Sequence, residues 1–329
     1  MDLEKDRPVS PEELDDVIQS LATEEQLYSI AVFDILGFSN YVNSNTTDQV
    51  LKLYEALVTI LNKRKTIDIG ILENTSGVPV PDSGDWKVNH FVAQANGYSH
   101  VVHFSDTFIL YMHYRLTAFP FHLRTQYYEG NPLLFNDKFE PDDCIFNHAM
   151  YLAFLQTCME FFCEAISIGI PLRGCVSTGP AVMNHVKNVY VGSALVDAAK
   201  GEPVLNSIGL LFGSSFRKFH PVYSSFFIPY NANRKTEKND KASIMALDWP
   251  RYWREKEPYC TMNLEEKIMD MNNDPAHSSY YENAVDFVRF SETHHDWASE
   301  IETENVTNID EYYDAVKKWF GDKYHSERK

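Results

Sequence analysis

The stretch AVFDILGFSN at residues 31–40 places a single aspartate, Asp34, where an otherwise apolar run ends. The surrounding LYSIAVFDIL predicts a buried strand, because it is apolar and rich in β-branched and aromatic side chains. Gly37 predicts a turn after this strand, and apolar residues recur at helical spacing from Ser39 to Asn62. A strand, a glycine turn and a helix in this order favour an α/β protein that presents Asp34 at the tip of a strand.

The surroundings of Asp34 suit a divalent cation that holds a polyphosphate. The cation would bind the carboxylate, while backbone amides from about Leu36 to Ser39 would bind phosphate oxygens. Gly37 would let the backbone approach such a ligand closely. The alternative is that Asp34 only caps the following helix.

A second lone aspartate, Asp106, lies in VVHFSDTFILY at the predicted turn between two apolar strands. Two carboxylates at the ends of neighbouring strands repel each other unless a cation lies between them. One ion of a two-metal site would help to deprotonate a hydroxyl nucleophile, and the other would neutralise phosphates. The alternative is that Asp106 is an ordinary hairpin-turn residue.

The chain is expected to form one α/β core with additions at both ends. Residues 1–24 are expected to form an N-terminal helical lead-in, because Ser10 and Glu13 form a capping box. Residues 25–220 are the predicted catalytic domain, and residues 221–329 are a helical extension packed on the core or on a dimer interface. Within the core we expect a loop at 74–85 and a turn at Asn96–Gly97.

Several later elements are also predicted by their patterns. A long amphipathic helix covers about residues 145–168 and ends at Gly169 and Pro171. The segment PLRGCVSTGPAVM predicts a strand and its turn, and NVYVGSALVDAAKGE predicts a strand that runs into a helix. A further strand and helix start are predicted in ASIMALDWPRYW, and two helical segments in the last 50 residues.

Composition limits the classes of partner. The 329 residues are 44% hydrophobic, which supports a substantial core, and no segment is predicted to span a membrane. The polar, acidic N-terminus does not resemble a secretory signal, so we expect a cytoplasmic protein. A net charge of −18 disfavours binding to nucleic acid or to an anionic membrane. The five cysteines lack metal-site spacing and are expected mostly in the core: Cys144, Cys158, Cys163, Cys175 and Cys260.

Four segments, FDILGFS, FSDTF, LRGCVSTGPAV and YVGSALVDAAKGE, resemble in this order the signature segments of class III nucleotidyl cyclases. The resemblance covers about residues 28–215 and implies a ferredoxin-like βαββαβ core sheet with flanking helices. It also implies that Asp34 and Asp106 bind two Mg²⁺ or Mn²⁺ ions, together with the backbone carbonyl of Ile35. The family usually carries Gly-Asp in the second segment, so Ser105 departs from its pattern.

The third and fourth segments imply further roles. Arg173 matches the family arginine that grips the terminal phosphates, whereas a surface arginine at a strand edge is the alternative. Lys200 lies where relatives carry an arginine that stabilises the transition state, and Val196 lies where they carry a ribose-orienting asparagine. Asp197 could replace that asparagine if the helix were shifted. The alternative for Lys200 is an ordinary solvated lysine.

The positions that select a purine in relatives fall on His100 and Val189, and neither repeats a purine-reading pattern. In this respect the chain resembles the bacterial Pycsar pyrimidine cyclases, which make cyclic UMP or cyclic CMP as an antiphage second messenger for a separate effector. Phe38, Tyr41 and His100 could face a small base, although an aromatic on an apolar helix face is more often part of the core.

The resemblance therefore implies a homodimeric uridylate cyclase with its sites at the subunit interface, because class III sites lie between two catalytic domains. Gly37, Phe38 and Ser39 would contact UTP together with Arg173, and Lys200 would reach across from the other subunit. The alternatives are a cytidylate cyclase, an adenylate or guanylate cyclase, and a degenerate domain that binds a nucleotide without turnover. No direct contact with the effector is expected.

Overall fold

The computed structural model describes residues 26–62, 99–113, 148–184, 187–214, 226–230, 245–272, 275–301 and 309–327. The strands are β1 (Gln26–Ile35), β2 (Ser99–Phe104), β3 (Thr107–His113), β4 (Leu172–Asn184), β5 (Val189–Gly192), β6 (Gly209–Phe212), β7 (Phe227–Pro229) and β8 (Met245–Leu247). The helices are α2 (Phe38–Ser44), α3 (Thr47–Asn62), α7 (His148–Ser167), α8 (Ser193–Gly201), α9 (Trp249–Glu255), α10 (Leu264–Asp270), α11 (Ser278–Thr293), α12 (Trp297–Glu300) and α13 (Ile309–Glu327), with short 3-10 helices η3 (Glu202–Val204), η6 (Tyr259–Thr261) and η7 (Pro275–His277).

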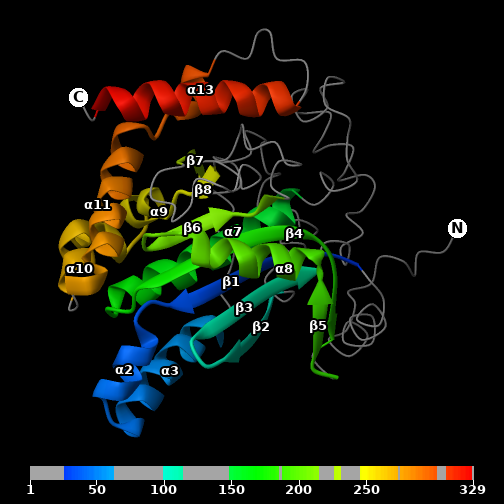
Figure 1. The fold of residues 1–329 in the computed structure, drawn as a ribbon, viewed down its shortest axis with the longest axis vertical. Coiled ribbons are helices and arrows are strands. Elements are labelled where there is room, and N and C mark those ends of the chain that lie inside the picture. The colour runs from blue at the N-terminus through cyan, green and yellow to red at the C-terminus, as the bar shows by residue number, and fades with distance from the viewer. Residues whose placement is uncertain are drawn as a thin grey trace, which may run out of the picture.

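The described strands form one mixed sheet, in the order β2-β3-β1-β4-β6-β8-β7, with β5 paired to β4 (Figure 1). β1 pairs antiparallel with both β3 and β4, whereas β4 and β6 run parallel. The predicted mixed α/β class, with a single sheet and flanking helices, is confirmed. The sheet also includes β7 and β8, which come from beyond residue 220.

β1 lies inside the sheet and is buried on both faces, which explains its nearly continuous apolar sequence. Ala31 and Phe33 belong to the main core cluster, which also contains buried residues of α7. Ile30 and Val32 belong to a smaller cluster on the opposite face, together with Ala194 and Ala198 of α8. The period of two along the strand therefore separates two helical layers.

α7 begins at His148 and ends as its sequence predicted. Gly169 has a φ of 84°, a left-handed conformation that favours glycine. The amide of Ile170 donates to the carbonyl of Ala165 at 2.8 Å, and the amide of Gly169 donates to that of Ile166 at 2.9 Å. This C-terminal cap turns the chain directly into β4.

β4 continues to Asn184 through Gly179 and Pro180, where the sequence predicted a turn. β1 begins early enough to continue the ladder, and Gln26 pairs with Ala181. The predicted strand and helix after it are confirmed as β5 and α8, and the later strand and helix start as β8 and α9. The predictions for residues 1–24, for the loop at 74–85 and for Asn96–Gly97 lie outside the described residues.

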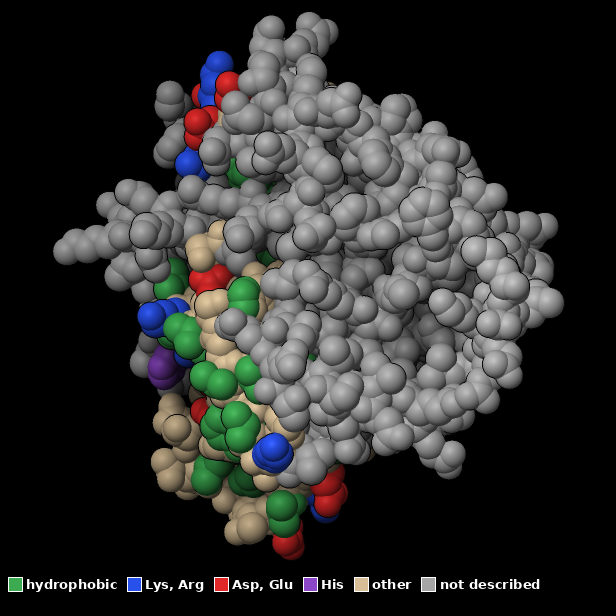
Figure 2. Space-filling model, turned by 90° about the vertical axis from the view of Figure 1, so that its right-hand side faces the viewer, with side chains coloured by type: hydrophobic (Ala, Val, Ile, Leu, Met, Phe, Trp, Pro, Cys, Tyr) green, Lys and Arg blue, Asp and Glu red, His purple; other side chains and the backbone are tan. Residues whose placement is uncertain are grey.

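Hydrophobic side chains remain exposed on the described part of the face that carries β5 (Figure 2). Val189 and Val191 of β5 are 43% and 57% exposed, and Val196 of α8 is 48% exposed.

In the core, Cys158, Cys163 and Cys175 are buried free thiols, as predicted. None of the helices within the described ranges is both long and apolar enough to cross a membrane.

Candidate functional site

Asp34 lies near the end of β1, where the strand leaves the core. Side chains alternate along a strand, so Asp34 is on the same face as Ile30 and Val32. Its side chain is 20% exposed. The aspartate that interrupts the apolar run is therefore placed at the strand tip, as predicted.

Asp106 occupies the turn between β2 and β3 and lies next to the end of β1. The amide of Ile35 donates a hydrogen bond to the carbonyl of Asp106 at 3.1 Å, and Asp34 pairs with Thr107 in the ladder. Ser105 has a φ of 54°, in the left-handed region that favours glycine. Glycine would adopt this conformation without steric cost.

The two carboxylates interact with each other. Burial raises the pKa of Asp34 above its ordinary value, and the charge of Arg173 lowers it. Asp106 raises the pKa of Asp34 further, both through its charge and through a hydrogen bond between the side chains. Two carboxylates this close need either a shared proton or a cation between them.

Arg173 is opposite Asp34 in the ladder between β1 and β4. Its Nη2 donates to Asp34 Oδ2 at 3.1 Å, and its Nε forms an ion pair with Glu202 in η3. The side chain is only 14% exposed. Arg173 is therefore held between two carboxylates, and a phosphate that binds it must share or replace these contacts.

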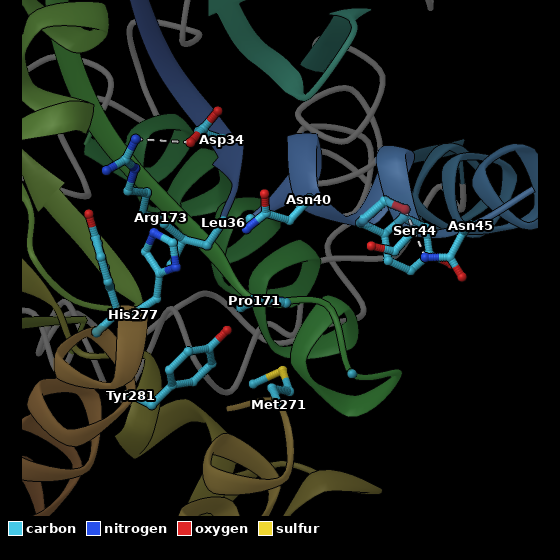
Figure 3. Close-up of a pocket in the computed structure, with 14 residues that line it drawn as sticks. Asp34, Leu36, Asn40, Ser44, Asn45, Pro171, Arg173, Met271, His277 and Tyr281 are labelled. Atoms are coloured by element: carbon cyan, nitrogen blue, oxygen red, sulfur yellow. Dashed lines mark hydrogen bonds and ion pairs between the residues drawn. The ribbon is translucent and has the colours of Figure 1, made fainter. Parts of the chain in front are cut away.

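A cavity of about 750 Å³, called the site cavity below, opens beside Asp34 and Arg173 (Figure 3). Its walls come from the end of β1 with α2, from the turn between α7 and β4, and from four residues of the C-terminal extension. The lining residues are Asp34, Leu36, Gly37, Asn40, Tyr41, Ser44, Asn45, Gly169, Pro171, Arg173, Met271, His277, Tyr280 and Tyr281.

Gly37 opens the backbone to the site cavity. Its φ is 75°, and no heavy atom lies within 4 Å of the position that a Cβ would take. This left-handed conformation favours glycine, and a ligand could approach the main chain here. Tyr41 of α2 lies one helical turn after Gly37 and also lines the cavity. It too was predicted to bind substrate.

Six of the predicted site residues do not line the site cavity: Ile35 and Asp106, described above, and Phe38, Ser39, His100 and Lys200. Phe38 is 9% exposed and belongs to the main core cluster, so its side chain packs in the core and does not face the cavity. Ser39 is exposed at the start of α2, and Lys200 is exposed in the last turn of α8. His100 stacks on Tyr111 across the ladder between β2 and β3, with ring centroids 5.2 Å apart.

Asp197 fastens α8 to the sheet. Its carboxylate accepts hydrogen bonds from Ser177 Oγ at 2.7 Å and from Ser214 Oγ at 2.8 Å. A Cβ at Gly213 would collide with this carboxylate, so a larger residue there would displace the Asp197 side chain. Asp197 therefore has a structural role, whereas its neighbour Val196 is exposed.

The side chains at the strand tips fit a hard divalent cation. Among the described residues, no three His, Cys, Asp or Glu side chains gather into a metal-binding group. Mg²⁺ commonly binds through one or two carboxylates together with water and substrate phosphates, and a pair of aspartates meets that requirement. Asp34 and Asp106 could supply the carboxylates, and the cavity beside them could supply room for phosphates.

Sequence reasoning missed several residues of the site. Glu202, which pairs with Arg173, ends the segment YVGSALVDAAKGE but was given no role there. Tyr54 of α3 and His103 of β2 form a 3.0 Å hydrogen bond near Asp106; burial and, less strongly, the charge of Asp106 raise the pKa of Tyr54. The extension residues of the site cavity were also missed. The cluster of His277, Tyr280 and Tyr281 within five residues was the one signal that could have indicated them.

Comparison of the chain with protein-family models, with curated proteins and with solved structures gives no match in any of the three. A function is therefore inferred from the chemistry of the site itself.

Proposed function

We propose that the protein is a pyrimidine nucleotide cyclase that converts UTP into 3′,5′-cyclic UMP and pyrophosphate. The observation that carries this proposal is the interaction of Asp34 with both Asp106 and Arg173, at the point where Asp34 and Arg173 line the site cavity. The cavity volume of about 750 Å³ is in the range typical of small-molecule sites. CTP is the alternative substrate, followed by ATP and GTP.

The connection order supports a class III cyclase-like core. The described elements β1, α2 with α3, β2, β3, α7 and β4 follow one another in a βαββαβ order. Their strands lie in the sheet order β2-β3-β1-β4, which is the order of a ferredoxin-like sheet. In such a core the tip of β1 and the β2–β3 turn are neighbours, and both predicted metal-binding aspartates lie there.

The proposed reaction is an in-line displacement at the α-phosphorus of the nucleotide. The 3′-oxygen forms a bond to this phosphorus, the bond from phosphorus to the α,β-bridging oxygen breaks, and pyrophosphate leaves. Arg173 would hold the terminal phosphates, and the exposed backbone at Gly37 would lie against them. The proton of the 3′-hydroxyl passes to solvent or to a nearby base.

Asp34 and Asp106, with the carbonyl of Ile35, would hold two Mg²⁺ or Mn²⁺ ions. When bound, these ions supply charge neutralisation for the phosphates and a lowered pKa for the attacking hydroxyl. Without them, the negative charges of the two carboxylates would repel a triphosphate. Burial raises the pKa of Asp34 and the neighbouring Asp106 adds to the rise, so a cation beside the pair would favour the ionised form of both carboxylates.

A homodimer is part of the proposal. Lys200 is exposed on α8, where its ammonium could reach a site on a second subunit. The exposed Val189, Val191 and Val196 lie on β5 and on the same helix, and apolar side chains of this kind favour a protein interface. His100, on the face of the sheet that α8 covers, is the candidate to contact the base.

The assay is an incubation of the purified full chain with UTP, CTP, ATP or GTP in the presence of Mn²⁺, followed by chromatography of the products. Cyclic UMP and pyrophosphate in equal amounts are the expected products. Cyclic AMP or cyclic GMP alone would reject the pyrimidine assignment, and the absence of any cyclic product would reject the enzyme. In the cell, we propose that the cytoplasmic product acts on a separate effector in antiphage defence.

One observation favours a second candidate, a nucleotide-binding regulator without turnover. Val196 replaces the asparagine expected from the family, and Asp197 is fixed by two serine hydroxyls, so it does not replace that asparagine. A domain of this kind would bind a nucleoside triphosphate but release it unchanged. Equilibrium binding of UTP measured beside the product assay separates the two candidates.

A further inference from the structure

The site cavity is completed by the C-terminal extension of the same chain. Met271, His277, Tyr280 and Tyr281 form one wall, here called the extension wall, more than 200 residues after Asp34. In Figure 3, His277 and Tyr281 project from this wall, and the His277 ring lies below Arg173 and points toward the Asp34–Arg173 pair.

The extension wall is fixed to the rest of the core. Tyr281 is 8% exposed and belongs to the main core cluster. The amide of Ile208, just before β6, donates to the carbonyl of Tyr280 at 3.4 Å, and Asn283 Nδ2 donates to the carbonyl of Asn206 at 2.7 Å. These contacts hold the first turn of α11 against the segment that enters the sheet, so the wall is a built part of the cavity.

The charges around the site cavity indicate what this wall can bind. Among the described lining residues, Asp34 is the only carboxylate, and it lies at the inner end beside Arg173. The extension wall carries an imidazole, two phenols and a thioether, but no acidic side chain. Arg173 already pairs with Asp34 and Glu202, so a polyphosphate needs further hydrogen-bond donors beyond it.

We infer that the extension wall binds the phosphate tail of the substrate, and that an imidazole N–H of His277 donates to an oxygen of the β- or γ-phosphate. The inference rests on the proposed function, because the phosphate tail enters the cavity only if the metal pair holds the α-phosphate. The extension then selects for a triphosphate and also retains the pyrophosphate product. The hydroxyl of Tyr281 is the second donor on this wall.

Calorimetric titration of the full chain with pyrophosphate in the presence of Mn²⁺ tests this inference without turnover. His277→Ala is expected to raise the dissociation constant about tenfold, the usual effect of losing one hydrogen bond to a charged group. His277→Gln keeps an N–H donor and is expected to retain most of the affinity. His295→Ala is the matched control, because His295 is an exposed histidine that bonds to Asp296 and to the carbonyl of Glu292 instead.

A parallel titration with cyclic UMP, which lacks the phosphate tail, separates a direct contact from a general disturbance. His277→Ala should leave this affinity unchanged, and the exposed position of His277 predicts an unchanged unfolding temperature. Equal pyrophosphate affinity in wild type and His277→Ala would overturn the inference, as would an equal loss for both ligands. If pyrophosphate affinity falls as expected while wild type yields no cyclic product, the extension wall stands and the cyclase proposal fails.

Discussion

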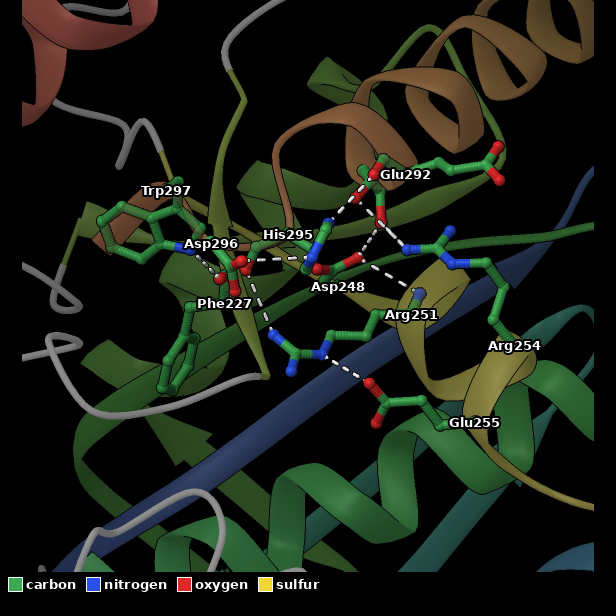
Figure 4. A network of polar contacts seen from close by, with 10 residues as sticks. Phe227, Asp248, Arg251, Arg254, Glu255, Glu292, His295, Asp296 and Trp297 are labelled. Atoms are coloured by element: carbon green, nitrogen blue, oxygen red, sulfur yellow. Dashed lines mark hydrogen bonds and ion pairs between the residues drawn. The ribbon is translucent and has the colours of Figure 1, made fainter. Parts of the chain in front are cut away.

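Two buried or half-buried aspartates of this protein, Asp34 and Asp248, have raised pKa values in very different surroundings. Asp248 is 1% exposed and caps α9, where it accepts hydrogen bonds from the Arg251 amide at 3.3 Å and from Ser291 Oγ at 2.5 Å (Figure 4). Arg254 completes this network, because its Nη2 donates a hydrogen bond to Ser291 Oγ at 3.0 Å. Burial raises the pKa of Asp248 to about 6, although Ser291 and Arg254 oppose the rise.

Burial raises the pKa of Asp34 too. Asp34, however, interacts with a second carboxylate, that of Asp106 in the β2–β3 turn, which raises the pKa further. The donors around Asp248 satisfy it within the protein, and no further ligand is needed there. Asp34 instead lines the site cavity and interacts with Asp106, and Arg173 supplies one positive charge for the two carboxylates. The difference separates a carboxylate that stabilises the fold from a pair of carboxylates that is suited to bind cations.

The largest expected effect comes from removing one charge of the pair. Asp34→Asn or Asp106→Asn should lower turnover of UTP at least about a thousandfold, because each removes a carboxylate ligand of the proposed metals. Product chromatography measures the loss, and size-exclusion chromatography checks that each variant elutes as the wild type does. Asp248→Asn is the matched control and should retain turnover. Near-normal product from either site variant would remove the two-metal model.

Truncation of Asp248 is expected to act on stability instead. Asp248→Ala removes the cap of α9 and leaves the Ser291 hydroxyl and the Arg251 amide without their acceptor, at a cost of about 2–4 kcal/mol in the free energy of unfolding. Asp248→Asn keeps an acceptor oxygen and should lose much less. Urea denaturation measures both. An Asp248→Ala variant as stable as wild type would show that the network does not stabilise the fold.

The pKa of Asp248 also predicts a pH dependence. It is about 6 in the folded protein against an ordinary value of 3.8 for an aspartate, so the folded state binds more protons between these pH values. The contribution of Asp248 to stability is therefore fully present below about pH 4 and is lost as the pH rises through 6, by on the order of 3 kcal/mol. The wild-type minus Asp248→Asn difference in unfolding free energy should show this fall. A difference that is flat from pH 4 to 7 would contradict it.

The smallest expected effect concerns the turn that carries Asp106. Ser105→Gly should stabilise the protein by up to about 1 kcal/mol, because glycine adopts the positive φ of this position without steric cost. Turnover should be retained, since Ser105 contributes conformation and no ligand. Thermal denaturation and the UTP assay measure the two effects. A large loss of turnover would assign a chemical role to the Ser105 hydroxyl.

The sequence predicted the parts of this molecule that depend on local pattern. Asp34 and Asp106 were found because each interrupts an apolar strand, and the end of α7 was found because Gly169 must take a positive φ. Phe38 was assigned to substrate, but helical spacing directs it into the core. Local spacing cannot separate an aromatic that packs from one that binds.

The extension wall was beyond sequence reasoning for a different reason. His277 and Tyr281 lie near Asp34 only because α11 is attached to the segment before β6, and no local periodicity reports that contact. Glu202, in η3 directly after α8, likewise pairs with Arg173 of β4 only because of the tertiary fold. Contacts between distant parts of the chain thus complete a site whose centre was visible in short motifs.

The most direct test of the central claim is a titration of the full chain with Mn²⁺ in the presence of pyrophosphate, followed by electron paramagnetic resonance of the free ion. Wild type and Asp248→Asn should bind Mn²⁺ with the same affinity and stoichiometry, whereas Asp34→Asn and Asp106→Asn should each lose most of that binding. Equal Mn²⁺ binding by all four proteins would contradict the account.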